Sequence, residues 1–302
     1  MRSRVLLFGH RGARGLFPEN TLEGFAKTVD LGVDGIELDV AVTADGVPVV
    51  CHDPALDPEM ARGADGAWVS PPTRLIRELS WVELQNFDVG RARRGGAVAR
   101  ANPAQVPHDG ARIPRLEDAL ATIPVHILIE LKTLADEPER TVAPEAMAEA
   151  ALAAIDRADA AGRVTIESFD WRGPRHVRRV RPELPLAWLT RAHTVANARL
   201  WWGGPHPDDF SGSVPRAVAA EGGGTWAPEH VDLNEAVIAE AHGLGLRVLP
   251  WTVNAAARMA ELIGWGVDGF ITDRPDVGRK VMSEAGLSVP PVTRPRPPRP
   301  GS

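Results

Sequence analysis

"GIELDVAV", residues 35–42, is a short stretch in which apolar and charged side chains alternate. Side chains of a β-strand point to opposite faces in turn, so the apolar residues share one face and the two carboxylates, Glu37 and Asp39, share the other. A second stretch, "LIELK", repeats the arrangement and places Glu130 and Lys132 on one face. Such strands are typical of a barrel whose apolar faces pack under helices and whose charged residues reach the mouth at the C-terminal strand ends.

The rest of the chain repeats one unit, in which a short apolar run is followed by a polar turn and a helical pattern. The strand candidates are residues 5–9, 35–42, 47–53, 125–132, 164–169, 186–190, 247–253 and 269–273, with 225–228 as a weaker ninth. The helix candidates include residues 21–31, 144–161, 234–244 and 255–265. Strands that alternate with helices at this pace indicate parallel β/α units, and this number of strands favours a (β/α)₈ TIM barrel over an open sheet.

Two segments interrupt the expected barrel. "TADG", residues 43–46, joins the second and third strands with no room for a helix, so this pair is expected to distort the barrel. A long gap follows His52, and we interpret residues 55–112 as an insertion after the third strand that serves as a lid or a substrate-facing loop. The domain prediction is therefore a barrel over residues 1–287, followed by a disordered Pro/Arg-rich tail over residues 288–302.

The composition excludes several classes of function. The chain has 302 residues and a formal net charge of −6, which gives no general reason to expect nucleic acid as a partner. The single cysteine, Cys51, excludes an internal disulfide and argues against a thiolate metal site. The N-terminal apolar run is too short for a secretory signal, and no segment approaches the roughly 18 apolar residues of a membrane span. We therefore expect a cytoplasmic protein without stable membrane insertion.

Three carboxylates, those of Glu37, Asp39 and Glu130, are expected to converge in the barrel mouth. Carboxylates this close would repel each other and raise each other's pKa values unless a cation holds them. A ligand set made only of oxygen atoms suits Mg²⁺ or Ca²⁺ better than zinc. The alternative is that the carboxylates only form ion pairs with Arg11 and Lys132, but three of them with the same inward phase favour a metal site.

"FGHRGARGLFPENT", residues 8–21, follows the first strand and contains three glycines. A dinucleotide-binding turn has the pattern G-x-G-x-x-G, but here its second glycine position is Arg11, whose side chain would block the approach of a pyrophosphate. The predicted helix also begins too late for that fold, with Asn20 as its expected N-cap. We conclude that this stretch presents His10 and Arg11 instead.

Two histidines, His10 and His52, end the first and third strand candidates and are expected to flank the carboxylates. An imidazole can take or give a proton near neutral pH, so the pair could act in acid/base catalysis. Arg11 and Lys132 would supply the positive charge that a phosphoryl group requires in its transition state. The complete set fits metal-assisted cleavage of a phosphodiester.

Several motifs together make the chain resemble the glycerophosphodiester phosphodiesterase family over about residues 10–277. They are "GHRGARGLFPENT", "GVDGIELDVAVTADGVPVVCHDP", "IELK", "SF", "PWTVN" and "GVDGFITDRPD". The resemblance implies a TIM barrel that hydrolyses glycerophosphodiesters to sn-glycerol 3-phosphate and an alcohol with a divalent cation. The implied site consists of the catalytic histidines His10 and His52, the metal ligands Glu37, Asp39 and Glu130, and the substrate-binding residues Arg11, Lys132 and Trp251.

The resemblance also implies how the histidines work: one deprotonates the glycerol 2-hydroxyl and the other protonates the leaving alcohol, so that a cyclic glycerol phosphate forms. Asn254 and Asp273 of the resembling motifs are expected to cap the helices that follow them. Two alternatives stay open, a related barrel phospholipase that cleaves lipid headgroups and a non-catalytic phosphodiester-binding protein. The loop after "CHDP" departs from the family pattern, so the sequence does not predict which alcohol is preferred.

Overall fold

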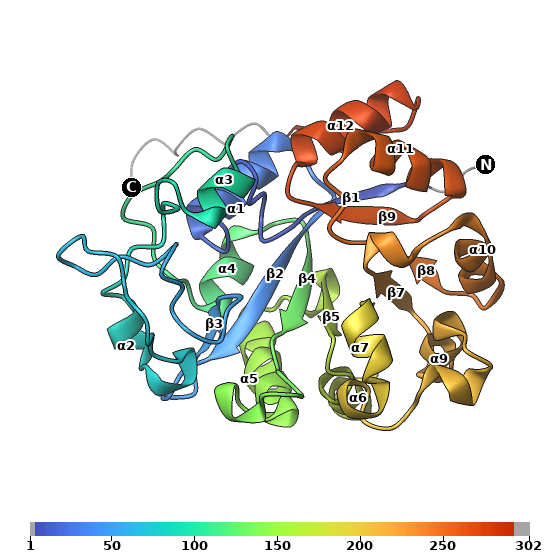
Figure 1. Cartoon of the computed structure of the whole chain (residues 1–302), viewed down its shortest axis with the longest axis horizontal. Coiled ribbons are helices and arrows are strands. Elements are labelled where there is room, and N and C mark those ends of the chain that lie inside the picture. The colour runs from blue at the N-terminus through green and yellow to red at the C-terminus, as the bar shows by residue number, and fades with distance from the viewer. Residues whose placement is uncertain (1–3, 293–302) are drawn as a thin grey trace.

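The computed structural model describes residues 4–292, which form the expected barrel (Figure 1). The parallel strands in this range are β1 (Leu6–Gly9), β2 (Gly35–Val42), β4 (His126–Leu131), β5 (Val164–Ser168), β6 (Leu186–Thr190), β7 (Thr225–Pro228), β8 (Arg247–Val248) and β9 (Gly269–Thr272). They follow the order β8-β7-β6-β5-β4-β2-β1-β9. Backbone hydrogen bonds from Asp268 N to Val248 O (3.1 Å) and from Ile271 N to Pro250 O (2.9 Å) join the two ends of this order, and so the barrel closes.

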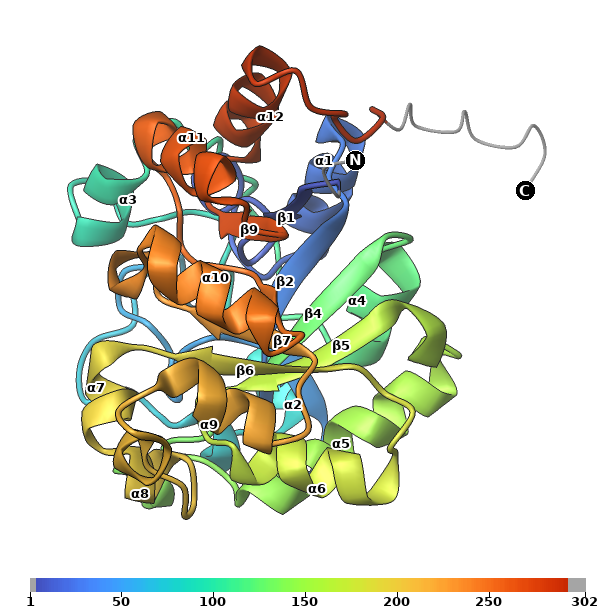
Figure 2. The same ribbon diagram turned by 90° about the vertical axis from the view of Figure 1, so that its right-hand side faces the viewer.

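Helices surround the strands on the outside (Figures 1 and 2). The longer ones are α1 (Leu22–Leu31), α4 (Leu116–Thr122), α5 (Pro144–Arg157), α6 (Arg172–Val180), α9 (Val214–Ala220), α10 (Glu235–Gly243), α11 (Ala256–Trp265) and α12 (Pro275–Glu284). The short ones are α2 (Trp81–Leu84), α3 (Ala97–Ala101), α7 (Ala192–Ala196) and α8 (Ala198–Trp201). Helix α5 ends before the expected residue 161, because Asp159 takes a left-handed φ of 49° that turns the chain towards β5.

The strand alternation divides the buried residues into two sets. On β2, Ile36, Leu38 and Val40 are fully buried in the main core, which also contains the inward faces of the helices. The opposite faces of the strands fill the inside of the barrel, where Phe8 and Leu249 pack in a smaller apolar cluster. The polar residues of this inner face are therefore free to reach the mouth above that cluster, as the sequence predicts.

The third strand candidate is a strand but not a member of the barrel. β3 (Pro48–Val50) pairs antiparallel with β2, with Val50 opposite Val40 and Pro48 opposite Val42. The five residues between the two strands, 43–47, leave no length for a crossover helix, so the chain can only fold back along β2. The remaining position in the ring is taken by β7, the "TWAP" stretch that the sequence favoured least.

The insertion after β3 has a small core of its own. Leu56, Ile76 and Leu84 pack there against Ala41 and Val49 of the hairpin. The only helices it contains among the described residues are the short α2 and α3 and a single 3₁₀ turn, Ile76–Glu78. In Figure 1 this region covers the side of the barrel next to β3.

The role of the insertion as a lid or substrate-facing loop stays a prediction, and residues 55–57 of it line a small pocket together with His52. None of residues 55–112 lines the cavity of about 620 Å³ at the mouth of the barrel. Gln105 instead donates hydrogen bonds from Nε2 to Arg14 O (2.7 Å) and Phe17 O (3.2 Å), and Val106 N donates to Leu16 O (2.8 Å). The insertion therefore braces the loop that follows β1.

The structure describes the predicted tail only up to residue 292. Pro290 is buried, its carbonyl accepts a hydrogen bond from Arg279 Nη1 (2.6 Å), and Val289 packs on the core. Residues 288–292 thus belong to the packed surface of the barrel rather than to a tail. The rest of the tail prediction, residues 293–302, lies outside the described residues. None of the helices between residues 4 and 292 has the length and apolar run that a bilayer crossing needs.

Candidate active site

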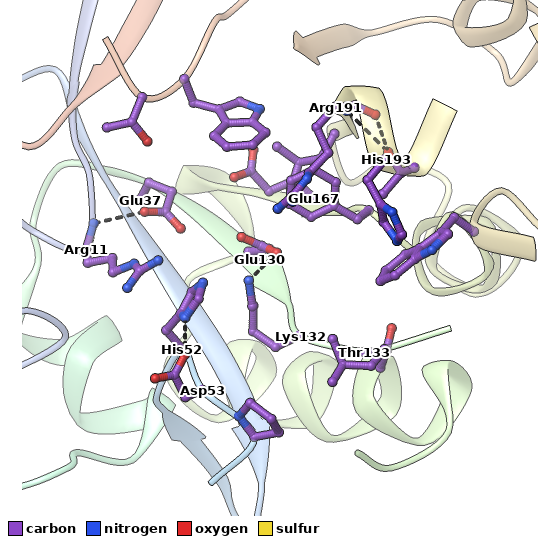
Figure 3. Close-up of a pocket in the computed structure, with 18 of the residues that line it drawn as sticks. Arg11, Glu37, His52, Asp53, Glu130, Lys132, Thr133, Glu167, Arg191 and His193 are labelled. Carbon is purple, nitrogen blue, oxygen red and sulfur yellow. Dashed lines mark hydrogen bonds and ion pairs between the residues drawn. The ribbon is translucent and has the colours of Figure 1, made fainter. Parts of the chain in front are cut away.

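A cavity of about 620 Å³ opens at the mouth of the barrel, where the C-terminal ends of the strands meet (Figure 3). Its lining includes most of the residues that the sequence predicts for the site: His10, Arg11, Glu37, His52, Glu130, Lys132 and Trp251. Asp39, the remaining one, is fully buried and does not line the cavity. The barrel mouth therefore brings together residues that are far apart in the sequence, as expected for this fold.

The three carboxylates form a compact group. Glu37, Asp39 and Glu130 each offer an oxygen, and these oxygens lie within 4.8 Å of one another. Glu37 Oε1 and Asp39 Oδ1 are buried and have no hydrogen-bond partner among the described residues. Buried carboxylate oxygens are normally satisfied, so this pair fits a divalent cation that binds between the three side chains.

The electrostatics of the group agree with that interpretation. Burial raises the pKa of Glu37 well above its usual range, and the charge of Asp39 raises it further. Burial also raises the pKa of Glu130, although Lys132 opposes the rise. Burial disfavours the charge of Asp39 as well, but the charges of Arg11, His52 and Lys132 and the hydrogen bond from Asn20 together outweigh it, so the pKa of Asp39 lies far below its usual range. A cation bound between these carboxylates would offset both the burial and the mutual repulsion that raise the pKa values of Glu37 and Glu130.

The turn after β1 is shaped by close packing of its backbone. A Cβ atom on Gly9 would lie 1.8 Å from Gly12 O, so only glycine fits at that position. Arg11, which lies between these two glycines in the turn, has a left-handed φ of 51° and donates its backbone N–H to Glu37 Oε2 (2.9 Å). The glycines thus serve the turn that presents His10 and Arg11, and they form no cradle for a dinucleotide.

Arg11 and Lys132 both form ion pairs with the carboxylates. Arg11 Nε lies 3.2 Å from Asp39 Oδ2, and its Nη1 donates to Glu19 Oε1 (2.8 Å). Lys132 Nζ donates to Glu130 Oε1 (2.8 Å) and lies 3.6 Å from Asp39 Oδ1. Ion pairing alone therefore accounts for part of the negative charge, but it leaves Glu37 Oε1 without a partner.

Each histidine of the site is held through Nδ1 by a carboxylate. His10 Nδ1 donates to Asp273 Oδ1 and His52 Nδ1 donates to Asp53 Oδ1, both at 2.6 Å. Each such bond fixes the tautomer and leaves Nε2 as the nitrogen that can exchange a proton. Burial lowers the pKa of both His10 and His52 below the ordinary value, although the two carboxylates oppose the shift. Two neutral imidazoles beside a candidate cation site can perform acid/base chemistry.

Comparison with known proteins agrees with this geometry. The model of the glycerophosphoryl diester phosphodiesterase family matches residues 10–277. The chain belongs to this family. It is 28% identical to the glycerophosphodiester phosphodiesterase of Bacillus subtilis over 282 residues, which cover 92% of this chain and 86% of that protein. It is 27% identical to the enzyme of the same name from Caldanaerobacter subterraneus, over 94% of this chain and 100% of that protein.

Solved structures agree on the fold. A Silicibacter pomeroyi protein assigned as a glycerophosphoryl diester phosphodiesterase superposes with a TM-score of 0.87, 37% identity and 95% coverage of both chains. An Oleispira antarctica phosphodiesterase, solved in complex with the product sn-glycerol 3-phosphate, superposes with a TM-score of 0.70 and 20% identity over 93% of this chain and 97% of that one. The TIM barrel of the family is thus shown for this chain.

Three polar residues in the family motifs do not have the roles that the sequence suggested. Helix α1 is capped by Thr21, whose side chain accepts from Gly24 N, while Asn20 takes a left-handed φ of 54° and donates from Nδ2 to Asp39 Oδ2 (2.8 Å). Asn254 and Asp273 cap no helix and bond each other, from Nδ2 to Oδ2 (2.7 Å). These side chains orient charged groups of the barrel mouth. The contacts join segments that are distant in the sequence, so the local sequence cannot reveal them.

The sequence analysis missed several residues of the site. Asp53 and Asp273 hold the histidines, and Glu19 receives the guanidinium of Arg11. Glu167, on β5, lines the cavity and is only 1% exposed. A signal for Glu167 was available, since in "VTIESF" it has the same inward phase as Glu130 and stands opposite it in register.

Proposed function

We propose that this chain hydrolyses glycerophosphodiesters to sn-glycerol 3-phosphate and an alcohol with the help of a divalent cation. The observation that carries the proposal is the buried group of Glu37, Asp39 and Glu130, two of whose oxygens accept no hydrogen bond, at a cavity that two carboxylate-held histidines also line. The family supports the chemistry, and the Oleispira antarctica protein binds sn-glycerol 3-phosphate as product.

The cation proposed here is Mg²⁺ or Ca²⁺, because all three ligands are carboxylates. When bound, it would act as a Lewis acid that withdraws charge from the phosphoryl group. Arg11 and Lys132 line the same cavity and would neutralise the phosphoryl oxygens that gain charge in the transition state. The ion pairs that Arg11 and Lys132 form with acidic residues hold both side chains in place before the substrate arrives.

The two histidines divide the proton transfers in this proposal. One imidazole takes the proton of the substrate's own 2-hydroxyl, whose oxygen attacks phosphorus, and the other gives a proton to the leaving alcohol. Water then opens the cyclic glycerol phosphate with the roles of His10 and His52 reversed. Trp251 meets Phe169 edge to face, with ring centroids 5.2 Å apart, and the two rings form an apolar wall for the carbon chain of glycerol.

A coupled assay for sn-glycerol 3-phosphate tests the proposal. Diesters of glycerol 3-phosphate with choline, ethanolamine, inositol and glycerol should each be tested with the metal-loaded protein and again in EDTA. We expect product from at least one diester with metal and none in EDTA. Asp39→Ala should abolish both turnover and calorimetric metal binding without unfolding the protein. Turnover by protein shown to be metal-free would refute the metal site.

The competing phospholipase function calls for an apolar surface that meets lipid at the cavity. The large apolar side chains that are exposed in the described residues are Val82, Val106, Val180, Leu200, Val231, Leu244 and Val292. None of these lines the cavity. The observation favours small water-soluble diesters, and vesicles of intact phospholipid added to the same assay should give no product.

A further inference from the structure

Glu167 is a buried carboxyl group without a partner. Its side chain forms no hydrogen bond or ion pair within residues 4–292, and Oε2 is buried and unsatisfied. Every other buried acid of the site has such a contact: Glu19 with Arg11, Glu37 with the backbone of Arg11, Asp39 with Asn20 and Glu130 with Lys132. Leaving a buried carboxyl unpaired is costly to stability, so its presence in the cavity wall calls for a ligand that satisfies it.

The backbone places this carboxyl one strand away from the candidate cation site. Ile166 packs in the outer core, so Glu167 points into the barrel, and its register partner on β4 is Glu130. Neighbouring strands lie about 4.8 Å apart. Figure 3 shows Glu167 beside Glu130, on the side away from His52. A substrate atom that contacts Glu167 therefore lies close to the candidate cation site.

The surroundings of Glu167 suit a small carbon chain. Its register partner on β6 is Ala187, which clusters with Leu189 and Ala227 and packs against the rings of Phe169 and Trp251. These small side chains leave space, and the apolar wall offers no hydrogen bond to compete with the carboxyl. By contrast, Asp136, Arg191 and His193 line the same cavity but are exposed at its rim.

The depth of Glu167 in the cavity determines which part of the substrate can contact it. The leaving alcohol must depart to solvent, which places it towards the rim, and the glycerol moiety then occupies the deep end. Its 2-hydroxyl reacts near the histidines, and the terminal hydroxyl is on the next carbon. We propose that Glu167 recognises the terminal hydroxyl of the substrate's glycerol moiety through a hydrogen bond and thereby sets the specificity for glycerol. This inference rests on the proposed function.

A pair of substrates tests this inference. One is glycerophosphoethanolamine, and the other is the matching diester of propane-1,2-diol, which keeps the 2-hydroxyl and lacks the terminal one. A hydrogen bond to a carboxylate should make kcat/KM roughly 10- to 100-fold higher for the glycerol diester in the wild type. Glu167→Ala should lose that factor on the glycerol diester only, so the ratio falls to about one. Glu167→Gln, whose amide can still bond a hydroxyl, should keep part of it.

Two further measurements separate specificity from a structural role. Glu221 is a buried carboxylate paired with Arg175 and Arg178 outside the cavity, so Glu221→Ala should lower Tm and leave the substrate ratio unchanged. Glu167→Gln should have a metal-free Tm equal to or above that of the wild type, because it removes an unpaired buried carboxyl. An equal loss on both substrates together with a lower Tm would overturn the inference. So would weaker calorimetric metal binding with an unchanged ratio.

The inference can fail separately from the proposed function. If the wild type hydrolyses neither diester, the proposed function is wrong, and the inference is then decided by binding. Calorimetry with sn-glycerol 3-phosphate and with propane-1,2-diol 1-phosphate should show tighter binding of the former, and this difference should vanish in Glu167→Ala. Equal affinities in the wild type would refute it.

Discussion

At the scale of single residues, both histidines of the site are held by a carboxylate side chain. His10 is held by Asp273 across 263 residues of sequence, and His52 is held by the neighbouring Asp53. Asn254 in turn bonds Asp273 through its side chain and also accepts from its backbone N–H (2.9 Å). The chain thus fixes the orientation of both imidazoles before a substrate binds, and in the proposed mechanism this saves the cost of ordering them during the reaction.

The histidines and their partner should respond differently to substitution. His10→Ala and His52→Ala should each lower kcat by about 10²- to 10⁴-fold, the usual contribution of an acid/base group. Asp273→Asn should lower kcat with little change in KM, because it disturbs the tautomer of His10 and leaves the phosphate contacts in place. Steady-state kinetics and circular dichroism would check these outcomes. Either alanine variant with more than a tenth of wild-type kcat would count against the assigned roles.

How far the sequence predicts the site depends on the range of the contacts. Strand alternation is a local pattern, and it was enough to find Glu37, Asp39 and Glu130, which the structure brings together. Asp273 was misread as a helix cap and Glu19 was missed, because their roles arise from contacts that only the closed barrel creates. Asn20 was misread as a helix cap for the same reason, since its partner Asp39 is on another element.

At the scale of elements, the turn after β1 links the strand to the site. Gly9 ends β1 and contacts the carbonyl of Gly12 so closely that no side chain fits. Hydrogen bonds from Gln105 and Val106 hold the rest of the loop that follows β1. The position of Arg11 and of His10 therefore depends on backbone packing rather than on the side chains alone.

Gly9→Ala tests this dependence. Its Cβ would overlap Gly12 O, at 1.8 Å, so we expect destabilisation by about 3 kcal/mol or more, which corresponds to a fall in Tm of about 5 °C or more. Gly162→Ala is the matched control, because nothing lies within 4 Å of a Cβ there, and it should leave Tm unchanged within error. Equal Tm values for the two variants in a thermal melt would show that the turn does not need glycine.

Elements were predicted well where the pattern is long and poorly where it is short. β2 and β4 were found from their alternation, and helices α1 and α11 came within one residue of their expected starts. The three residues of β3 and the four of β7 carry no local sign of whether they pair with a barrel strand or fold back in a hairpin. That choice is made by tertiary pairing, so β7 was undervalued and β3 was taken for a barrel strand.

At the scale of the whole molecule, the barrel concentrates negative charge at one buried point. In the metal-free protein, burial raises the pKa of Glu37 and of Glu130, so these carboxyls keep their protons up to a higher pH than they would in the unfolded chain. A carboxyl with a raised pKa is a source of instability that grows as the pH rises above its unfolded value, about 4.3. A bound cation displaces those protons and removes this penalty.

Metal binding should therefore be tighter at higher pH. We expect saturating Mg²⁺ or Ca²⁺ to raise Tm more at pH 8 than at pH 5.5, because fewer protons must be displaced at pH 8. Glu37→Gln should weaken the effect at both pH values. A Tm increase that is the same at both pH values, measured by scanning calorimetry, would mean that the cation does not compete with protons at these carboxyls.

The C-terminal residues give a second prediction at this scale. Removing residues 293–302 should change neither Tm nor turnover, since their composition offers little to bury. Removing residues 288–302 should lower Tm by about 2 °C or more, because it also deletes buried Pro290 and the bond from Arg279. Thermal melts of the two truncations in parallel would decide, and identical values would show that the contacts of residues 288–292 contribute nothing.

The central claim, metal-assisted cleavage that uses the substrate's own 2-hydroxyl, is tested most directly by ³¹P NMR. Glycerophosphocholine and its 2-deoxy analogue should be incubated side by side with the metal-loaded wild-type protein. The account predicts that the resonance of the first diester is replaced by that of sn-glycerol 3-phosphate, with a cyclic phosphate as a transient species, while the 2-deoxy diester persists. Comparable turnover of the 2-deoxy diester would contradict the proposed route, and no phosphomonoester from either diester would contradict the proposed activity itself.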